Sequence, residues 1–366
     1  MKLILYIGHH KVGSTALQMF LAQNWVKLAR HGILYPSVET RGFASTLARA
    51  LKGEDHAGEE DVNIREPHSA LAYKMMSEVS EHRKVPVQFR RLPASGQMLA
   101  ALQNQVRMLR PKTLILCSEA FANFGQVKPD LIRTLTRIFP KAEIEVYCAL
   151  RRPDDYLISW HNQRLKVGEQ IERLSAGGAE AYFGNIHFNF RTVVEPWGKQ
   201  LPEAKLIVRP YAEIMAAGGS TQDFMAQVGA KFPKKMIPAG RANRSLPRAA
   251  MEIVRRANHA LPGPQAHALT RFLLDDGHLT PVPDADVEMY GAELRTRIAE
   301  SFAPIHDWLS ERQGAPFFAD LDMMREARPI PEDQAMAQLL AQIDPSHLPG
   351  PEVARFLADL RQDLAA

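Results

Sequence analysis

A short loop near the start of the chain combines two glycines, a lysine and two hydroxyl side chains directly after an apolar run over 3–7. Backbone N–H groups that open onto a helix N-terminus bind anions such as phosphate. Gly8 and Gly13 have the spacing of the two glycines of a nucleotide-triphosphate P-loop, but Ser14 stands where that loop has its lysine. The lysine, Lys11, lies inside the loop instead. The pattern therefore predicts an anion cradle with chemistry other than ordinary ATP hydrolysis.

The loop has a purely structural alternative, a tight strand-to-helix turn in which Ser14 is the N-cap. A glycine pair alone would not decide between the two. The combination of a strand, a lysine, two hydroxyls and a following amphipathic helix favours anion binding.

A second candidate site follows another apolar run, which ends at residue 150. Arg151 leaves this run, and Pro153 with Asp154 marks the start of a helix. Ser159 lies eight residues beyond Arg151, about two turns into that helix. The planar fork of an arginine suits a phosphate monoester. The alternative is a surface arginine that pairs with Asp154 or Asp155.

Both segments need a scaffold that brings them together, and the hydrophobic pattern supplies one. Apolar runs alternate with stretches of helical period, which predicts an α/β fold with a parallel sheet covered by helices on both faces. Ligands of such sheets bind at the carboxyl ends of the strands. The predicted strands are 3–7, 32–35, 113–117, 144–150 and 206–208.

The remaining segments carry weaker signals. Residues 37–95 are polar and weakly periodic, and we interpret them as a long excursion that forms a lid or an acceptor-binding region. Strand signals stop near residue 216, and helices are predicted over 222–229, 246–275 and 287–312. We expect one α/β domain over 1–330, mainly helical from 216, and a helical extension over 331–366.

Composition limits the classes of function. The chain has 366 residues, 46% hydrophobic and 23% charged, and a net charge of +4, which is too mild a bias for nucleic-acid binding. Its two cysteines, Cys117 and Cys148, lie in strand-like runs and predict reduced thiols of a cytoplasmic protein. No apolar run approaches the roughly 18–20 residues of a membrane span, and the N-terminus is too short for a signal peptide.

The two candidate sites together resemble a known family. The sequence His-Lys-Val-Gly-Ser-Thr-Ala-Leu-Gln over 10–18 is similar to the 5′-phosphosulfate loop of sulfotransferases that use 3′-phosphoadenosine 5′-phosphosulfate (PAPS), most of all its bacterial members. Arg151-Arg152-Pro153 with Ser159 resembles the same family's 3′-phosphate motif. Arg152 departs modestly from the Asn or Asp of the cytosolic enzymes. The motifs cover about 1–30 and 110–165, in the family's order.

The resemblance implies a P-loop-like sulfotransferase fold, in which a three-layer parallel sheet is flanked by helices. It also implies transfer of a sulfuryl group from PAPS to a hydroxyl or amine, with adenosine 3′,5′-bisphosphate (PAP) as product and no metal ion. Arg151 and Ser159 would bind the 3′-phosphate. Lys11 would also stabilise the leaving oxygen. The 5′-phosphosulfate would be held by Lys11, Val12, Gly13, Ser14, Thr15 and Ala16.

Such a transfer needs a general base close to the acceptor hydroxyl. Glu119 follows the predicted strand 113–117 and occupies the position of the base in the cytosolic branch of the family. His10 and Glu39 compete for this role, and a capping or acceptor-positioning role is the alternative for Glu119. Two more histidines are interpreted as plain surface residues, namely His56 and His68.

A basic run over 231–256 is the last candidate. Related enzymes close the donor pocket with a basic loop from the C-terminal half, and Arg241 and Arg244 are the residues that would do so here. A solvated face or an anionic acceptor glycan explains the charge equally well.

Two other classes of function remain open at this point. One is a P-loop kinase or NTPase, and the other is a catalytically silent relative that binds nucleotide as an interaction module. The acceptor is also open: a glycan, a lipid headgroup and a small metabolite all fit. The sequence does not indicate an oligomeric state.

Overall fold

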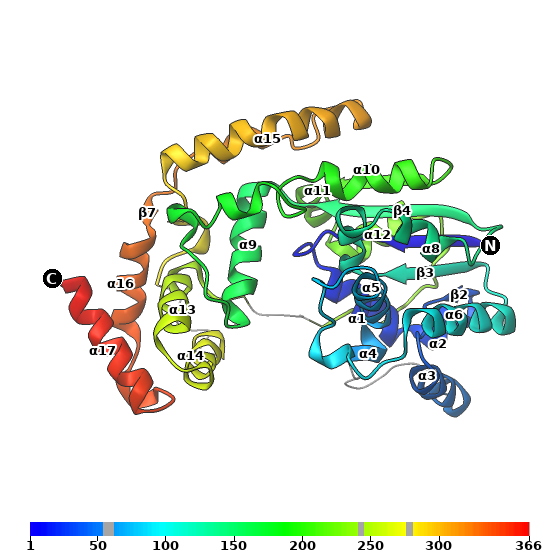
Figure 1. Cartoon of the computed structure of the whole chain (residues 1–366), viewed down its shortest axis with the longest axis horizontal. Coiled ribbons are helices and arrows are strands. Elements are labelled where there is room, and N and C mark those ends of the chain that lie inside the picture. The colour runs from blue at the N-terminus through cyan, green and yellow to red at the C-terminus, as the bar shows by residue number, and fades with distance from the viewer. Residues whose placement is uncertain (54–61, 241–244, 276–280, 366) are drawn as a thin grey trace. The chain divides into compact units, whose positions relative to one another are not determined.

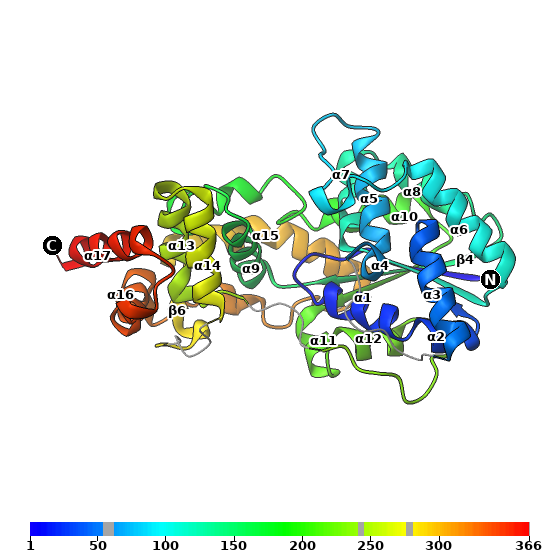
Figure 2. The ribbon, with the colours of Figure 1, turned by 90° about the horizontal axis from the view of Figure 1, so that it is seen from below.

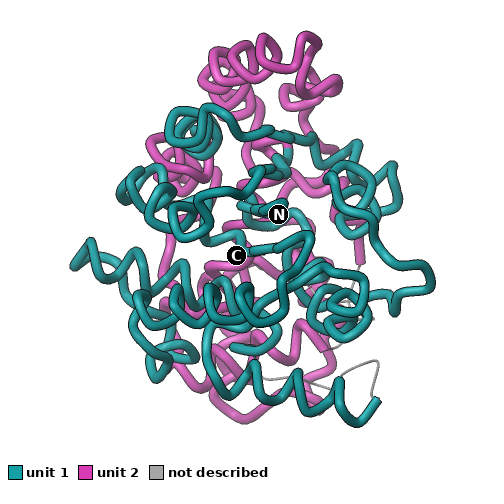
Figure 3. The backbone as a smooth tube through the Cα atoms, turned by 90° about the vertical axis from the view of Figure 1, so that its right-hand side faces the viewer, with its two compact units in different colours: residues 1–151, 189–242 teal, residues 152–188, 243–366 magenta. Residues whose placement is uncertain are grey.

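The computed structural model describes residues 1–53, 62–240, 245–275 and 281–365. These residues form two compact units (Figure 3). The first unit comprises 1–151 and 189–242, and the second comprises 152–188 and 243–366. The tail over 331–366 belongs to the second unit.

The first unit contains a five-stranded parallel sheet (Figure 1) with the order β2-β3-β1-β4-β5. All five predicted runs become strands, and the α/β class is confirmed. The two central strands are almost completely buried because helices cover both faces of the sheet, which is why their sequences are apolar throughout. The strands are β1 (Lys2–Tyr6), β2 (Ile33–Leu34), β3 (Thr113–Cys117), β4 (Glu143–Leu150) and β5 (Lys205–Pro210).

The strand order contains a reversal that marks a binding position. The connection after β1 runs toward β2 at one edge, whereas the connection after β4 runs toward β5 at the other edge. Open α/β sheets bind ligands in the crevice beyond the carboxyl ends of two such strands. The loop with Lys11 follows β1, and Arg151 follows β4 directly. The two sequence candidates therefore follow the carboxyl ends of neighbouring strands.

The helices of the first unit pack in groups around this sheet. α12 packs beside α1 and α11 (Figure 2), while α10 packs against α7 and α8. The helices of this unit are α1 (Ser14–Gln23), α2 (Trp25–Arg30), α3 (Thr40–Lys52), α4 (Val62–Arg65), α5 (Pro67–Ser77), α6 (Ser95–Leu109), α7 (Phe124–Val127), α8 (Asp130–Thr136), α10 (Arg191–Gln200), α11 (Tyr211–Ala216) and α12 (Ser220–Gln227), with 3-10 turns η1 (Val87–Phe89) and η2 (Glu119–Asn123).

The excursion over 37–95 is more helical and more buried than its weak periodicity predicts. Eight of the 11 residues of α5 are buried, so this helix has no polar face and no clear hydrophobic period. His68 was expected at the surface, and this prediction is wrong. Its side chain is fully buried, its Nδ1 accepts a hydrogen bond from the N–H of Cys117 at 3.1 Å, and burial lowers its pKa to about 3. His68 is a core residue that joins α5 to β3.

The second unit is mainly helical. The helix predicted over 246–275 is interrupted at residues 261–262, where proline cannot continue the hydrogen-bond ladder. The helix predicted from 287 begins at 292, and a two-stranded parallel sheet that the sequence did not indicate precedes and follows it. The elements are α9 (Pro153–Lys166), α13 (Arg248–Ala260), α14 (Gly263–Asp275), α15 (Ala292–Gln313), α16 (Glu332–Gln342) and α17 (Pro351–Ala365), strands β6 (Val287–Glu288) and β7 (Ile330–Pro331), and turns η3 (Leu174–Ala176), η4 (Glu180–Tyr182), η5 (Asp284–Asp286), η6 (Leu321–Arg325) and η7 (Pro345–His347).

None of the helices in the described ranges combines the length and the apolar character that crossing a membrane requires.

Candidate functional site

The loop after β1 has the backbone of an anion cradle. Gly8, Lys11 and Gly13 all have positive φ angles, of 108°, 60° and 85°. Within the described part of the chain, the N–H groups of Gly13 and Ser14 have no hydrogen-bond acceptor. Two adjacent free donors at the start of α1 can bind an anion, and the helix dipole adds to their attraction.

The structural alternative for this loop made Ser14 the N-cap, and that assignment is wrong. Gly13, and not Ser14, is the N-cap residue of α1, and no side chain caps the helix. A Cβ atom at Gly13 would overlap the hydroxyl of Ser220 and lie 3.0 Å from its Cβ. The second glycine is therefore required by its φ angle and by the close approach of α12.

Glu119 lies directly beside this loop. A Cβ atom at Gly8 would lie only 3.1 Å from the Cα of Glu119, so glycine allows β1 to end against η2. Burial raises the pKa of the Glu119 carboxyl, the negative charge of Glu66 raises it further, and the Ser14 hydroxyl and Lys11 partly oppose the shift. One carboxyl oxygen, Oε2, is buried without a hydrogen-bond partner among the described residues.

His10 is the other candidate base and belongs to the loop itself. Its side chain is 9% exposed, and burial together with the positive charges of His9, Lys11 and Arg83 holds its pKa well below the usual value. Its Nε2 lies 3.4 Å from the amide Nδ2 of Asn123, which is on the same turn as Glu119. The imidazole is therefore neutral and weakly basic near pH 7.

Glu39, the third candidate base, has a different role. Its two carboxyl oxygens accept hydrogen bonds from the N–H groups of Arg41 at 2.8 Å and Gly42 at 2.7 Å. It is the N-cap of α3. Both oxygens accept backbone hydrogen bonds, which gives Glu39 a capping role.

Arg151 stands at the end of β4 without a carboxylate partner. Among the residues that the structure describes, no acid lies within ion-pair distance of its guanidinium, which stacks 5.6 Å from the ring centroid of Tyr211. The ion pair with Asp154 that was the alternative for Arg151 is formed by the buried Arg152. Arg152 is 7% exposed and donates to Asp154 at 2.7 Å and Asp320 at 2.5 Å.

A cleft of about 1130 Å³ connects the loop with Tyr211. Gly13 and Ala16 of the loop and α1 form one wall, and the residues around Ser220 form another. Tyr211 lines this cleft, and the Arg151 guanidinium lies 5.6 Å from the centroid of its ring. Methionines and aromatic rings make the rest of the lining largely apolar, among them Phe20, Met215, Met225, Phe232 and Met236.

The remaining predicted site residues belong to other parts of the chain. Ser159 is a partly exposed residue of α9 in the second unit, and its role stays a prediction. Arg241, Arg244 and His56 lie outside the described residues. Elsewhere in the basic run, Arg255 and Arg256 both donate to the buried carboxylate of Glu252, at 2.7 and 2.8 Å. This part of the run is an internal ion-pair cluster of α13.

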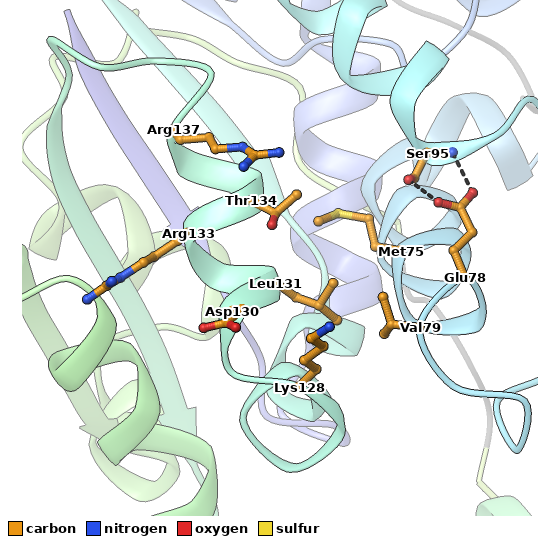
Figure 4. A pocket seen from close by; sticks show the side chains of 10 residues that line it. All are labelled: Met75, Glu78, Val79, Ser95, Lys128, Asp130, Leu131, Arg133, Thr134 and Arg137. Atoms are coloured by element: carbon orange, nitrogen blue, oxygen red, sulfur yellow. Dashed lines mark hydrogen bonds between the residues drawn. The ribbon is translucent and has the colours of Figure 1, made fainter.

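A second pocket of about 470 Å³ lies in the first unit, between α5, α6 and α8 (Figure 4). Glu78 at its rim accepts hydrogen bonds from the N–H and hydroxyl of Ser95, and Arg133 points away from the Met75 side. It contains none of the predicted site residues, so its exposed Arg137 provides a control position outside the site.

Sequence reasoning missed the part that α12 plays in the site. The hydroxyl of Ser220 donates a hydrogen bond to the carbonyl of Val12 at 2.7 Å. The sequence signal was the pair Gly218-Gly219, which precedes the helix and allows this close approach, with φ angles of 97° and 105°. Nothing in the local pattern indicates which loop the following serine contacts.

Comparisons with known proteins add little to this picture. No family model and no solved structure matches the chain. An uncharacterized protein of Archaeoglobus fulgidus is 27% identical to it over 151 residues. This similarity covers 40% of the chain and 39% of that protein, so the chain spans less than half of its relative.

Proposed function

We propose that this protein is a sulfotransferase that moves a sulfuryl group from PAPS to a hydroxyl or amine of an acceptor. The observation that carries the proposal is the pair of cationic sites at the ends of neighbouring strands. One is the loop with Lys11 after β1, and the other is Arg151 after β4, which no described acid neutralises. A donor with phosphate groups at both ends of an adenosine fits this pair.

The cleft supports the same substrate. The 5′-phosphosulfate would be bound by the free N–H groups of Gly13 and Ser14, and the 3′-phosphate by Arg151. The apolar lining between them, which includes Ala16 and Tyr211, suits the adenosine. Arg241, Arg244 and Ser159 remain proposed donor contacts on the strength of the resemblance alone.

The reaction is an in-line displacement at sulfur. The acceptor oxygen or nitrogen forms the new bond to sulfur, and the bond between sulfur and the bridging oxygen of the 5′-phosphate breaks. The electron pair of that bond leaves with PAP, whose developing charge Lys11 neutralises. The acceptor proton passes to the general base. Every proton and charge is accounted for by the two substrates and these side chains.

We assign the general base to Glu119 in preference to His10. A raised pKa makes the Glu119 carboxylate a better proton acceptor than an ordinary glutamate, and its Oε2 has no competing hydrogen bond. The lowered pKa of His10 makes its imidazole a weaker one. We therefore expect His10 to shape the site as a neutral group.

The proposal is tested by the binding of PAP and of ADP, measured by calorimetry. Wild type is expected to prefer PAP, and Arg151→Ala to lose about 100-fold in PAP affinity with ADP affinity unchanged, because only PAP has a 3′-phosphate. Lys11→Ala is expected to weaken the binding of both nucleotides. The control Arg137→Ala removes an exposed arginine of the second pocket and should bind as wild type does.

Equal affinity of wild type for PAP and ADP would contradict the proposal. Tight, magnesium-dependent binding of ATP without binding of PAP would instead favour a kinase or NTPase. Binding of PAP without turnover on any acceptor, with Glu119→Ala leaving the function unchanged, would favour a silent interaction module.

A further inference from the structure

We propose that Ser220 is a positioning residue of the donor loop, which fixes the Val12–Gly13 peptide so that the Gly13 N–H faces the 5′ anion. The inference rests on the proposed function. Its basis is the hydrogen bond of 2.7 Å from the Ser220 hydroxyl to the carbonyl of Val12. Ser220 is the first residue of α12 and belongs to the same unit as the loop.

The geometry of a peptide bond gives this contact its effect. The C=O of Val12 and the N–H of Gly13 belong to one planar trans unit and point in opposite directions. Because Ser220 holds the carbonyl on the α12 side, the N–H is directed away from α12. If the peptide flipped, it would present a carbonyl oxygen to the anion and remove one donor.

Gly13 cannot fix this orientation by itself. Its φ of 85° lies in a region that glycine shares almost freely with its mirror region, so the backbone at this position tolerates both orientations. Its N–H has no acceptor among the described residues. The N–H is therefore available to a ligand, and the Ser220 hydroxyl is the contact that selects its direction.

α12 is in turn held against the strands that carry the other end of the site. Asp223, fully buried on α12, accepts hydrogen bonds from the Tyr147 hydroxyl of β4 at 2.6 Å and from Arg209 of β5 at 3.0 Å. These strands end next to Arg151 and Tyr211. Ser220 therefore positions the loop relative to the same strands that position the arginine.

The proposed role of Ser220 can be distinguished from that of Arg151 by which of the two nucleotides each variant binds less tightly. PAP and ADP share the 5′-phosphate, so a loop with a misdirected N–H binds both of them less well. Ser220→Ala is expected to lower both affinities by a common factor of about ten, the effect of one lost hydrogen bond to a charged group. Arg151→Ala lowers the affinity for PAP alone.

The experiment measures PAP and ADP binding and thermal stability for wild type, Ser220→Ala and Ser220→Thr. We expect Ser220→Thr, which keeps the hydroxyl, to recover most of both affinities. The matched control is Thr192→Ala on α10, which removes another hydroxyl-to-carbonyl hydrogen bond of 2.7 Å, to Asn189, and should leave both affinities unchanged.

Wild-type affinities in Ser220→Ala would overturn the inference. A parallel loss of affinity and of thermal stability in both Ser220 variants would also overturn it, because Ser220 would then serve folding alone. If wild type binds PAP and ADP equally while Ser220→Ala weakens both, the inference stands and the proposed function fails. If wild type binds neither nucleotide, both fail.

Discussion

Arg151 and Arg152 are neighbours in the chain, yet they belong to different compact units and have opposite surroundings. Arg152 is buried in the second unit and bound to Asp154 and Asp320, whereas Arg151 in the first unit has a tyrosine ring and, among the described residues, no acid beside it. A buried cation that is fully paired keeps its partners' charges compensated, and removing it would leave them buried and unpaired. A cation at a strand end with no acid nearby is available to an anion. The two arginines differ in their partners, and not in residue type.

The second unit contains another buried arginine that is paired with an acid, on α15. Arg295 is 1% exposed, donates to Glu288 at 2.8 Å and stacks 5.4 Å from the ring centroid of Tyr290. The carboxylate of Glu288 also accepts hydrogen bonds from the N–H groups of Tyr290 and Arg328. These contacts bind the start of α15 to the small sheet.

The largest effect is expected when this pairing is broken. Arg295→Met leaves the Glu288 carboxylate buried beside an apolar side chain and should lower the free energy of unfolding by about 3–5 kcal/mol. Urea denaturation measures this change. Arg297→Met on the same helix is the control, because Arg297 is 53% exposed and its pair with Glu180 should contribute less than about 1 kcal/mol. Equal losses of stability in the two variants would contradict the expected difference between a buried and an exposed ion pair.

A second prediction compares a buried acid with an exposed acid of the second unit. Burial raises the pKa of Glu332 to about 7, although the ion pair with Arg173 opposes the shift; Glu252 and Asp333 add to it. The folded state therefore keeps a proton that the unfolded chain releases near pH 4.5. Stability should fall between pH 4.5 and 7, by up to about 3 kcal/mol for this group.

The measurement is the difference in unfolding free energy between wild type and Glu332→Gln from pH 4.5 to 7.5. The glutamine variant should lack this part of the decline, so its advantage over wild type grows with pH. Glu352→Gln, on the exposed first turn of α17, is the control and should follow wild type. A difference that does not change with pH would contradict the assignment.

The smallest expected effect concerns the loop itself. Gly13 and Gly53 have φ angles of 85° and 75°, but only Gly13 lacks room for a Cβ atom, because Ser220 occupies that space. Gly53→Ala should lose about 1 kcal/mol of stability from backbone strain alone, and Gly13→Ala about 2 kcal/mol or more. Gly13→Ala should also weaken the binding of both nucleotides. Thermal denaturation and calorimetry test the two variants. Equal losses of stability would show that α12 moves aside easily to make room for the Cβ atom.

The sequence predicted much of the first unit. All five strands and the positions of the loop and Arg151 at their carboxyl ends follow from apolar runs and glycine spacing, which are local patterns. Prediction failed where burial is complete or contacts are distant. α5 has no polar face to produce a period, and His68 looks like any other histidine until β3 covers it.

The sequence by itself determined the sheet, the loop after β1 and an arginine after β4, because each depends on residues within one short segment. Only the tertiary structure decided that Arg152 has acids beside it while Arg151 has none among the residues placed by the structure, that Glu39 caps a helix, and that Ser220 contacts a loop more than 200 residues away. These outcomes depend on which distant groups share a buried volume. Charge pairing and hydrogen bonding act over a few ångströms in space, whatever the separation along the chain.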